Sequence, residues 1–294
     1  MATWLVTGAD GMLGRDLVTM LRAVRQRVIP ATRTVLDLTD RRAVDAAVTT
    51  IARIGAHGSG SIVVNLDSWA DVDAAEVDEG AARAINVHGA ANLAQACGRS
   101  GLRLIHLSTS YVFDGVSTEP YAEDAPVSPA TAYGRTMADG ERAVLEALPE
   151  AGVVLRTGWL YGEYGRSFVR TAATAATERP FTDVIDDQWG QPTWTLDVAD
   201  RIVDIGRAAG VSGVLHAVNS GATTWFGLAR AVYAELGLDP ERVRPVAADQ
   251  VPRIVPRPAH SVLSQERWAR FGLAPLRPWR EALRAAAPSV LGVE

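Results

Sequence analysis

The sequence predicts an α/β fold with a doubly wound parallel sheet and a smaller C-terminal lobe. Short apolar runs alternate with helical patterns through the first half of the 294 residues, which is typical of a parallel sheet covered by helices on both faces. Beyond Arg156 the alternation becomes irregular, and the chain is long enough for a core with a second lobe. We therefore predict a core in residues 1–156 and a lobe mainly in 157–294, with some later segments returning to the core.

The first strand and the first helix have the clearest boundaries. The apolar run at residues 3–7 stops at a glycine, and apolar positions then recur at helical spacing from Met12 to Val24. Residues 245–258 contain four prolines, so an ordered loop is expected there rather than a helix. The other predicted strands are 27–30, 61–65, 103–108, 152–156 and 213–216, and the other predicted helices are 41–54, 78–99, 133–148, 168–178, 198–209 and 224–236.

The composition argues against several classes of protein. With 29 basic and 34 acidic residues and no basic run, the chain lacks the charge pattern of a nucleic-acid-binding protein. No apolar run approaches the roughly 18 residues of a membrane span, and the N-terminus lacks a signal-peptide pattern, so we expect a cytoplasmic protein without membrane contact. The five histidines show no metal-site spacing, and no metal is expected. Cys97 lies in a helical apolar pattern that predicts a buried structural thiol.

Three glycines follow the first strand at the spacing of a dinucleotide-binding turn. Gly8 permits the tight turn, Gly11 lets the backbone approach a pyrophosphate, and Gly14 allows close packing of the helix. The N-terminus of that helix offers unpaired amides to an anion. The position between a strand and a helix makes the motif specific, and it makes the predicted sheet Rossmann-type. Further candidate cofactor-binding residues in the same turn are Asp10, Met12 and Leu13.

The choice of cofactor depends on the end of the second strand. An acidic residue there would bind the 2′-hydroxyl of NAD, whereas an arginine suits the 2′-phosphate of NADP. The chain has Arg33 at this point, and the candidates Asp37 and Leu38 follow, with Asp37 expected near the adenine. We therefore favour NADPH, with NADH as the alternative. A second interpretation is that Arg33 is an ordinary solvated surface charge.

Hydroxyl groups mark a candidate reacting end on the fourth predicted strand. Ser108 and Thr109 should lie at the carboxyl edge of the sheet, where open α/β sheets bind ligands. Tyr133 begins a helical pattern 24 residues after Thr109 and can reach the same point above the sheet. The alternative is that Tyr133 packs its ring in the core and uses its hydroxyl for a structural hydrogen bond.

Matched blocks over most of the chain resemble extended short-chain dehydrogenases and, within them, the dTDP-4-dehydrorhamnose reductase family. Among these blocks are Val72-Asp73-Ala-Ala-Glu76, Ile85-Asn86-Val-His-Gly89, Ser108-Thr-Ser-Tyr-Val-Phe113, Tyr133-Gly134, Gly140-Glu141, Arg156-Thr-Gly-Trp159, Asp187-Gln-Trp-Gly-Gln-Pro-Thr193 and Arg257-Pro258. The resemblance implies that Thr109 polarises a sugar carbonyl, that Tyr133 donates a proton, and that nicotinamide lies between them and the glycine turn. It also implies a dTDP-linked 4-keto-6-deoxysugar as substrate and a substrate-binding role for the smaller lobe. The sequence leaves monomer and homodimer open.

The catalytic motif of such reductases is incomplete in this chain. The resemblance implies Tyr-x-x-x-Lys, in which the lysine ammonium lowers the pKa of the tyrosine. The chain contains no lysine, and Met137 occupies the position. Arg135 is not expected to replace the cation, since residues two apart point to different helix faces. Loss of one preorganised electrostatic partner commonly costs on the order of 100- to 1000-fold in rate. Activity is therefore expected to be slow rather than absent if Thr109, Tyr133 and a water remain in place.

Two further departures from the family pattern concern the ligands. Ser110, a candidate substrate-binding residue, stands where the family usually has aspartate. The candidate cofactor-binding residues Leu66, Asp67 and Ser68, followed by Trp69, replace a small, alanine-rich segment after the third strand. Asp67 would add negative charge beside a diphosphate unless it is paired or turned away.

The candidate substrate contacts of the second half are aromatic or cationic. Trp159 and Trp189 offer faces that suit a thymine ring, although packing is the alternative role for each tryptophan. Arg257 suits a diphosphate through its planar donor fork, and Arg253 competes for this role. The leading hypothesis is an NADPH-dependent 4-ketoreductase of a dTDP-4-keto-6-deoxyhexose. The alternatives are a catalytically impaired nucleotide-binding or regulatory homologue and, ranked lower, a nucleotide-sugar epimerase or dehydratase.

Overall fold

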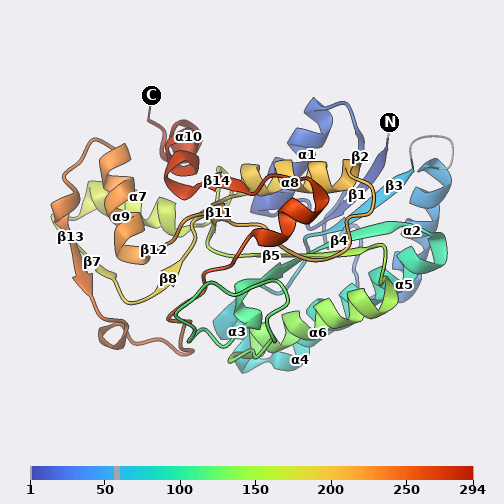
Figure 1. Ribbon diagram of the computed structural model, residues 1–294, viewed down its shortest axis with the longest axis horizontal. Coiled ribbons are helices and arrows are strands. Elements are labelled where there is room, and N and C mark those ends of the chain that lie inside the picture. Colours follow the sequence, from blue (N-terminus) through green and yellow to red (C-terminus); the bar gives the residue numbers. More distant parts are fainter. Residues whose placement is uncertain (1, 56–59, 294) are drawn as a thin grey trace.

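The computed structural model describes residues 2–55 and 60–293, and its centre is a six-stranded parallel sheet (Figure 1). The strand order is β10-β5-β4-β3-β1-β2, so the chain starts inside the sheet and winds outward to both edges. This order confirms the predicted doubly wound α/β fold. The strands are β1 Thr3–Thr7, β2 Arg27–Ala31, β3 Ser61–Asn65, β4 Arg103–Thr109, β5 Gly152–Thr157 and β10 Gly213–His216.

Helices cover both faces of the sheet (Figure 1). Strand β1 shows why both faces are apolar, because Trp4 and Val6 belong to one hydrophobic cluster and Leu5 belongs to the other. The first cluster packs beneath α1 and α8, and the second packs beneath α2, α5 and α6. These helices are α1 Met12–Ala23, α2 Arg41–Gly55, α5 Ala90–Ser100, α6 Ala132–Ala147 and α8 Thr195–Arg207.

The helix predicted at residues 78–99 is divided by a π-helical turn. It consists of α4 Glu79–Arg83, the π-helical segment Ala84–Gly89 and α5. Asn86 in the wide turn donates to the carbonyl oxygen of Trp69 at 3.2 Å and to the hydroxyl of Thr136 at 3.0 Å. The interruption thus ties the segment after β3 to α6. A separate short helix, α3 Val72–Val77, precedes it and was not predicted, because six residues give too little periodicity.

A third hydrophobic cluster lies in the C-terminal lobe. It gathers side chains of α7 Phe168–Glu178, α9 Trp225–Glu235 and α10 Trp279–Leu291, and includes the buried Trp194. The prediction omitted α10, whose helical pattern is interrupted by Pro288. The short strands pair as β6 Leu160–Tyr161 with β9 Thr193–Trp194, β7 Thr182–Ile185 with β13 Val243–Val246, β8 Trp189–Gly190 with β12 Thr223–Thr224, and β11 Asn219–Ser220 with β14 Leu276–Pro278.

Parts of the second half also belong to the first core. Helix α8 covers the sheet, β10 is its sixth strand, and Trp268 packs into the cluster beneath α1. The proline-rich segment 245–258 is less irregular than predicted, because Pro245 lies within β13. Within the described part of the chain, strand β13 pairs only with β7, and an edge strand tolerates the missing N–H of proline. The 3₁₀ segments are Ser110–Val112, Pro240–Arg242, Ala248–Gln250 and Glu266–Phe271.

Cys97 is fully buried in the cluster beneath α2 and α5, and burial raises the pKa of its thiol to about 12. The predicted structural thiol is therefore confirmed. Within residues 2–55 and 60–293, no helix has the length and apolar character needed to cross a bilayer. The same residues contain no cluster of three or more His, Cys, Asp or Glu side chains suited to a metal ion.

Candidate active site

The glycine turn between β1 and α1 brings backbone segments closer together than a side chain would allow. Gly8 adopts a φ of +64°, and a Cβ at this position would lie 2.7 Å from the backbone nitrogen of Asp67. A Cβ at Gly14 would lie 2.2 Å from the carbonyl oxygen of Gly8, so only glycine allows the helix to approach the turn. Gly11 precedes α1 without any side-chain cap. The first amides of the helix therefore face an open turn that fits an anion.

An ion pair lies at the end of the site where adenosine is expected. Arg33, after β2, donates to Asp67, after β3, with 2.7 Å between Nη2 and Oδ1. Asp67 is therefore paired, as its position beside a diphosphate would require. Asp37 accepts hydrogen bonds from the backbone and hydroxyl of Thr39, and these lower the pKa of its carboxyl. The carboxylates of Asp37 and Asp10 both contribute to a raised pKa of Arg33.

Several predicted cofactor residues have side chains that pack in the core or are only partly exposed. The side chains of Leu13 and Leu38 are buried in the two clusters on either side of the sheet. Leu66 packs partly against the first cluster, and Ser68 is half-buried. Met12 lies close to the backbone of the segment 162–165 of the second lobe. A bound dinucleotide would meet the backbone of Leu13 and Leu38 rather than their side chains.

The two predicted reacting hydroxyls meet at the carboxyl edge of the sheet. Thr109 ends β4, and Tyr133 lies in the first turn of α6. A Cβ at Gly134 would lie 2.1 Å from the carbonyl oxygen of Tyr111, so this glycine lets α6 approach the segment after β4. Burial raises the pKa of Tyr133 to about 12, and an interaction with the Thr109 side chain opposes the rise. The geometry allows both side chains to contact one carbonyl oxygen.

Met137 follows Tyr133 by one turn of α6 and faces the same way. It is 2% exposed and belongs to a hydrophobic cluster with Val112, Phe113 and Tyr133. Arg135 is directed elsewhere and pairs with Glu79, with 2.7 Å between Nη2 and Oε2. The structure therefore agrees with the expectation that Arg135 does not replace the missing lysine. The pKa of Tyr133 is governed by burial, without help from a cation among the described residues.

A buried charged network behind Thr109 was not predicted as part of the site. Glu141 accepts a hydrogen bond from Ser108 and pairs with Arg156, whose Nη2 lies 2.7 Å from Oε2. Arg156 also stacks over the ring of Phe113, with its Cζ 5.0 Å from the ring centroid. Glu141 lies eight residues after Tyr133, which places it on the same helix face. That spacing is the signal by which the sequence could have revealed it.

The candidate substrate residues Ser110, Trp159 and Trp189 differ in their surroundings. A Cβ at Gly158 would lie 3.1 Å from Oγ of Ser110, whose buried hydroxyl has no hydrogen-bond partner among the described residues. The ring of Trp159 then stacks on Trp225, with centroids 3.4 Å apart and an interplanar angle of 7°. Trp189 is 47% exposed on β8. Trp194, by contrast, is a buried packing residue of the second lobe.

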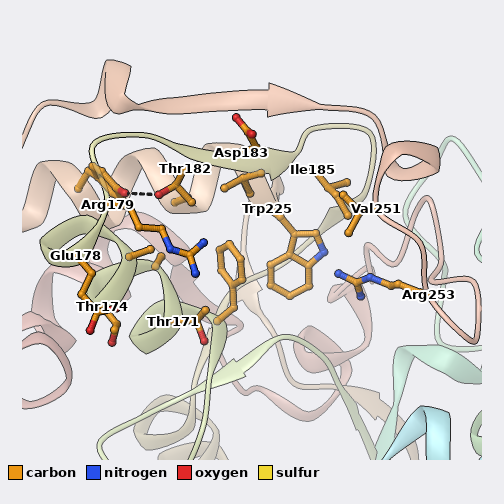
Figure 2. A pocket seen from close by; sticks show the side chains of 16 residues that line it. Thr171, Thr174, Glu178, Arg179, Thr182, Asp183, Ile185, Trp225, Val251 and Arg253 are labelled. Atoms are coloured by element: carbon orange, nitrogen blue, oxygen red, sulfur yellow. Dashed lines mark hydrogen bonds between the residues drawn. The ribbon is translucent and has the colours of Figure 1, made fainter.

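A cavity of about 570 Å³ lies beside Trp225 (Figure 2). Residues of α7, β7 and α9 line it. Arg253 lines the cavity and its guanidinium lies near Trp225 in the close-up. Arg257 instead holds Asp73 with both Nη atoms, at 3.0 and 2.6 Å. Burial raises the pKa of Tyr111, and the charges of both arginines oppose this rise, so they act near the reacting end. Arg257 is therefore paired with a carboxylate, whereas Arg253 has no carboxylate partner among the described residues.

The family described as the RmlD substrate binding domain matches residues 2–291. The chain belongs to this family. It is similar to the dTDP-4-keto-6-deoxy-D-glucose reductase of Streptomyces niveus, with 47% identity over 97% of this chain and 96% of the relative. It is also similar to a probable dTDP-4,6-dihydroxy-2-methyloxan-3-one 4-ketoreductase of Streptomyces antibioticus, with 50% identity over 99% and 96%. The dTDP-4-dehydrorhamnose reductase of Bacillus anthracis, solved in complex with NADP, superposes with a TM-score of 0.90 and 30% identity over 97% and 98%.

The three departures of this RmlD-family chain lie in different parts of the site. Asp67 follows β3 and pairs with Arg33, which follows β2. Ser110 lies beside Gly158, the residue that precedes Trp159. Met137 lies behind the tyrosine in an apolar cluster. Of these three side chains, only that of Asp67 carries a charge, whereas Ser110 and Met137 are neutral.

Proposed function

We propose that the chain is an NADPH-dependent 4-ketoreductase of a dTDP-4-keto-6-deoxyhexose in deoxysugar biosynthesis. The observation that carries the proposal is the meeting of Thr109 and Tyr133 at the sheet edge that also holds the glycine turn. The named reductases among the relatives support the same activity. The nicotinamide, when bound, supplies a hydride to C4 of the sugar.

Thr109 and Tyr133 would act on the carbonyl oxygen of the sugar. The Thr109 hydroxyl donates a hydrogen bond that polarises the carbonyl, and Tyr133 transfers its proton to the oxygen as the hydride reaches C4. The products are the sugar alcohol and the oxidised dinucleotide, and solvent returns the proton to Tyr133. With a pKa raised to about 12, Tyr133 stays protonated at neutral pH but is a weak acid. Slow turnover follows from this weakness.

The glycine turn and Arg33 would hold the cofactor. Gly8 and Gly11 would keep side chains away from the pyrophosphate, and Gly14 lets α1 pack close to the turn. The uncapped N-terminus of α1 would meet the charge of the pyrophosphate. We assign Arg33 to the 2′-phosphate, which favours NADPH, with NADH as the alternative cofactor.

The cavity beside Trp225 would receive the thymidine part of the substrate. Its lining is largely apolar, from Phe168, Ala172 and Ile185, which suits a base. Arg253 at its edge suits the diphosphate. The stack of Trp159 on Trp225 would then direct the sugar from this cavity toward Ser110 and Thr109. NADPH and the dTDP-linked sugar are cellular metabolites with charged phosphates, so we propose that the protein acts in the cytoplasm. Whether it is a monomer or a homodimer can be measured by light scattering.

One observation favours a second candidate, a nucleotide-binding homologue without catalysis. Met137 fills its site with an apolar side chain, and the reacting tyrosine lacks any cationic partner among the described residues. An epimerase or dehydratase is ranked lower, because solved structures with those names are only 21% and 17% identical and show the fold alone.

The deciding experiment is NADPH oxidation with a dTDP-4-keto-6-deoxysugar, run beside Tyr133→Phe and Thr109→Val. We expect slow turnover in the parent protein and at least a further 100-fold loss in Tyr133→Phe, because the proton donor is removed. NADPH binding without turnover would support the non-catalytic homologue. Absence of both binding and turnover would reject the reductase.

A further inference from the structure

An ion pair spans the glycine turn at the carboxyl edge of the sheet. Because β1 lies between β3 and β2, Asp67 and Arg33 stand on opposite sides of the turn that follows β1. Arg33 donates to Asp67 through Nη2 at 2.7 Å and through Nε at 3.4 Å. The backbone of Asp67 adjoins Gly8 so closely that a Cβ on Gly8 would lie 2.7 Å from its nitrogen. Both partners therefore border the proposed dinucleotide site.

Asp67 is the fixed member of this pair. Its backbone N–H donates to Oδ1 of Asn65 at 3.2 Å, and the same oxygen accepts from the hydroxyl of Thr7 at 2.7 Å. The side chain of Asp67 is 11% exposed, whereas that of Arg33 is 47% exposed. Arg33 is therefore the partner that can turn toward a ligand, and a turn away would leave a little-exposed carboxylate without its cation.

The surroundings of Arg33 are acidic. Asp67 pairs with this guanidinium and raises its pKa, and the charges of Asp37 and Asp10 act on it in the same direction. A 2′-phosphate that approached Arg33 would compete with Asp67 for the same planar donor fork. A 2′-hydroxyl would not, because it is neutral and can donate a hydrogen bond to a carboxylate.

We propose that Asp67 is a specificity-determining residue that weakens the preference for NADPH over NADH by occupying the donor fork of Arg33. The inference rests on the dinucleotide site of the proposed function. It concerns the ratio of two affinities and does not depend on turnover.

The test is isothermal titration of the parent protein, Asp67→Asn, Arg33→Met and the double variant with NADPH and with NADH, in the absence of sugar. In Asp67→Asn, which keeps the shape of the side chain, we expect the ratio of NADPH to NADH affinity to rise about fivefold, as for a partly exposed ion pair. The gain should appear in NADPH binding and shrink at 0.5 M salt. In the Arg33→Met background most of the Asp67→Asn effect should disappear. Asp67→Ala serves as a second variant should Asp67→Asn fold poorly.

Asp45→Asn is the matched control, because Asp45 also pairs with an exposed arginine, Arg99, but between α2 and α5. Its affinity ratio should equal that of the parent. A ratio within twofold of the parent in both Asp67 variants would overturn the inference while leaving the dinucleotide site intact, and so would an undiminished effect without Arg33. A parent protein that binds neither dinucleotide would overturn the site itself and the inference with it.

Discussion

Met137 shares its cluster with Val112, Phe113 and Leu263, and a lysine at this point would have to bring a charge into the same apolar surroundings. An unpaired buried ammonium costs several kcal/mol unless a ligand or a carboxylate meets it. Methionine removes that cost, because its flexible side chain fills irregular gaps. At the scale of the residue, Met137 therefore gives Tyr133 an apolar neighbour without the desolvation cost of a buried cation.

Met137→Lys should consequently raise the reductase rate and lower stability. We expect kcat to rise on the order of 100-fold, because a cation beside Tyr133 makes the tyrosine a stronger acid. The free energy of unfolding should fall by roughly 1 to 3 kcal/mol without ligand, measured by urea denaturation. Met137→Leu is the control and should change neither kcat nor the pH profile. An equal gain in Met137→Leu would show that packing, not charge, limits the rate.

The pH profile gives an independent check on the same residue. With the pKa of Tyr133 raised to about 12, its protonated form is present throughout pH 6 to 9, so kcat of the parent should be flat in that range. A lysine at position 137 lowers the pKa of the tyrosine, and kcat of Met137→Lys should then decline as pH rises and the proton donor is lost. A parent kcat that falls steeply between pH 7 and 9 would contradict the assigned state of Tyr133.

At the scale of elements, two glycines allow helices to pack close to the site. Substitution of one should lower kcat, and substitution of the other should lower NADPH affinity. A Cβ at Gly134 would lie 2.1 Å from the carbonyl oxygen of Tyr111, and a Cβ at Gly14 would lie 2.2 Å from that of Gly8. Gly134→Ala should move α6 and lower kcat at least tenfold with NADPH affinity retained, because Tyr133 is displaced from Thr109. Gly14→Ala should instead weaken NADPH binding at least tenfold, because α1 is displaced from the turn.

Gly98→Ala provides the control for both glycine variants. A Cβ at Gly98 on α5 would meet its nearest neighbour at 3.5 Å, which is ordinary contact, so both constants should stay within twofold. Equal losses of kcat and NADPH affinity in Gly134→Ala and Gly14→Ala would show general destabilisation rather than displacement of one helix. Steady-state kinetics and titration of NADPH separate these outcomes.

The success of the sequence prediction differs between elements for physical reasons. The strands of the core and the turn at Gly8 were predicted because burial on both faces and the need for a positive φ leave strong local patterns. The π-helical turn around Asn86 was not, because the hydrogen bonds that hold it come from Trp69 and Thr136, which are distant in sequence. The pair of Arg33 with Asp67 depends on strand order, which local spacing does not encode.

At the scale of the whole molecule, two buried histidines make stability depend on pH. Burial lowers the pKa of His106 to about 4 and that of His216 to about 3, whereas an unfolded histidine titrates near pH ~6.5. The unfolded chain therefore binds protons first. The free energy of unfolding should be constant above pH ~7 and fall below pH ~6.5 by up to about 1.4 kcal/mol per pH unit for each histidine.

Urea midpoints between pH 7.5 and 5 measure this dependence. His106→Gln should reduce the slope, because one of the two linked protons is removed. His88→Gln, at an exposed position, should leave it unchanged. A slope that is the same in His106→Gln and in the parent would show that other groups cause the acid sensitivity.

The proposed site draws on both lobes, since the cavity beside Trp225 lies in the second lobe and the reacting hydroxyls lie on the core sheet. Substrate binding should therefore stabilise the molecule even where chemistry is blocked, because a ligand that binds only the folded state raises Tm by mass action. We expect dTDP to raise Tm of Tyr133→Phe as much as that of the parent. Thermal unfolding with and without dTDP measures this.

Arg253→Ala should weaken binding of the diphosphate without weakening binding of the thymidine. Because its guanidinium lines the cavity and suits a diphosphate, its loss should weaken dTDP binding about tenfold and leave thymidine binding within twofold. Arg257→Ala is the matched control, since Arg257 is already held by Asp73 at 2.6 Å and should affect dTDP less. Isothermal titration with dTDP and thymidine decides the matter. Equal losses for both ligands in Arg253→Ala would place the diphosphate elsewhere and make Arg253 part of the cavity wall.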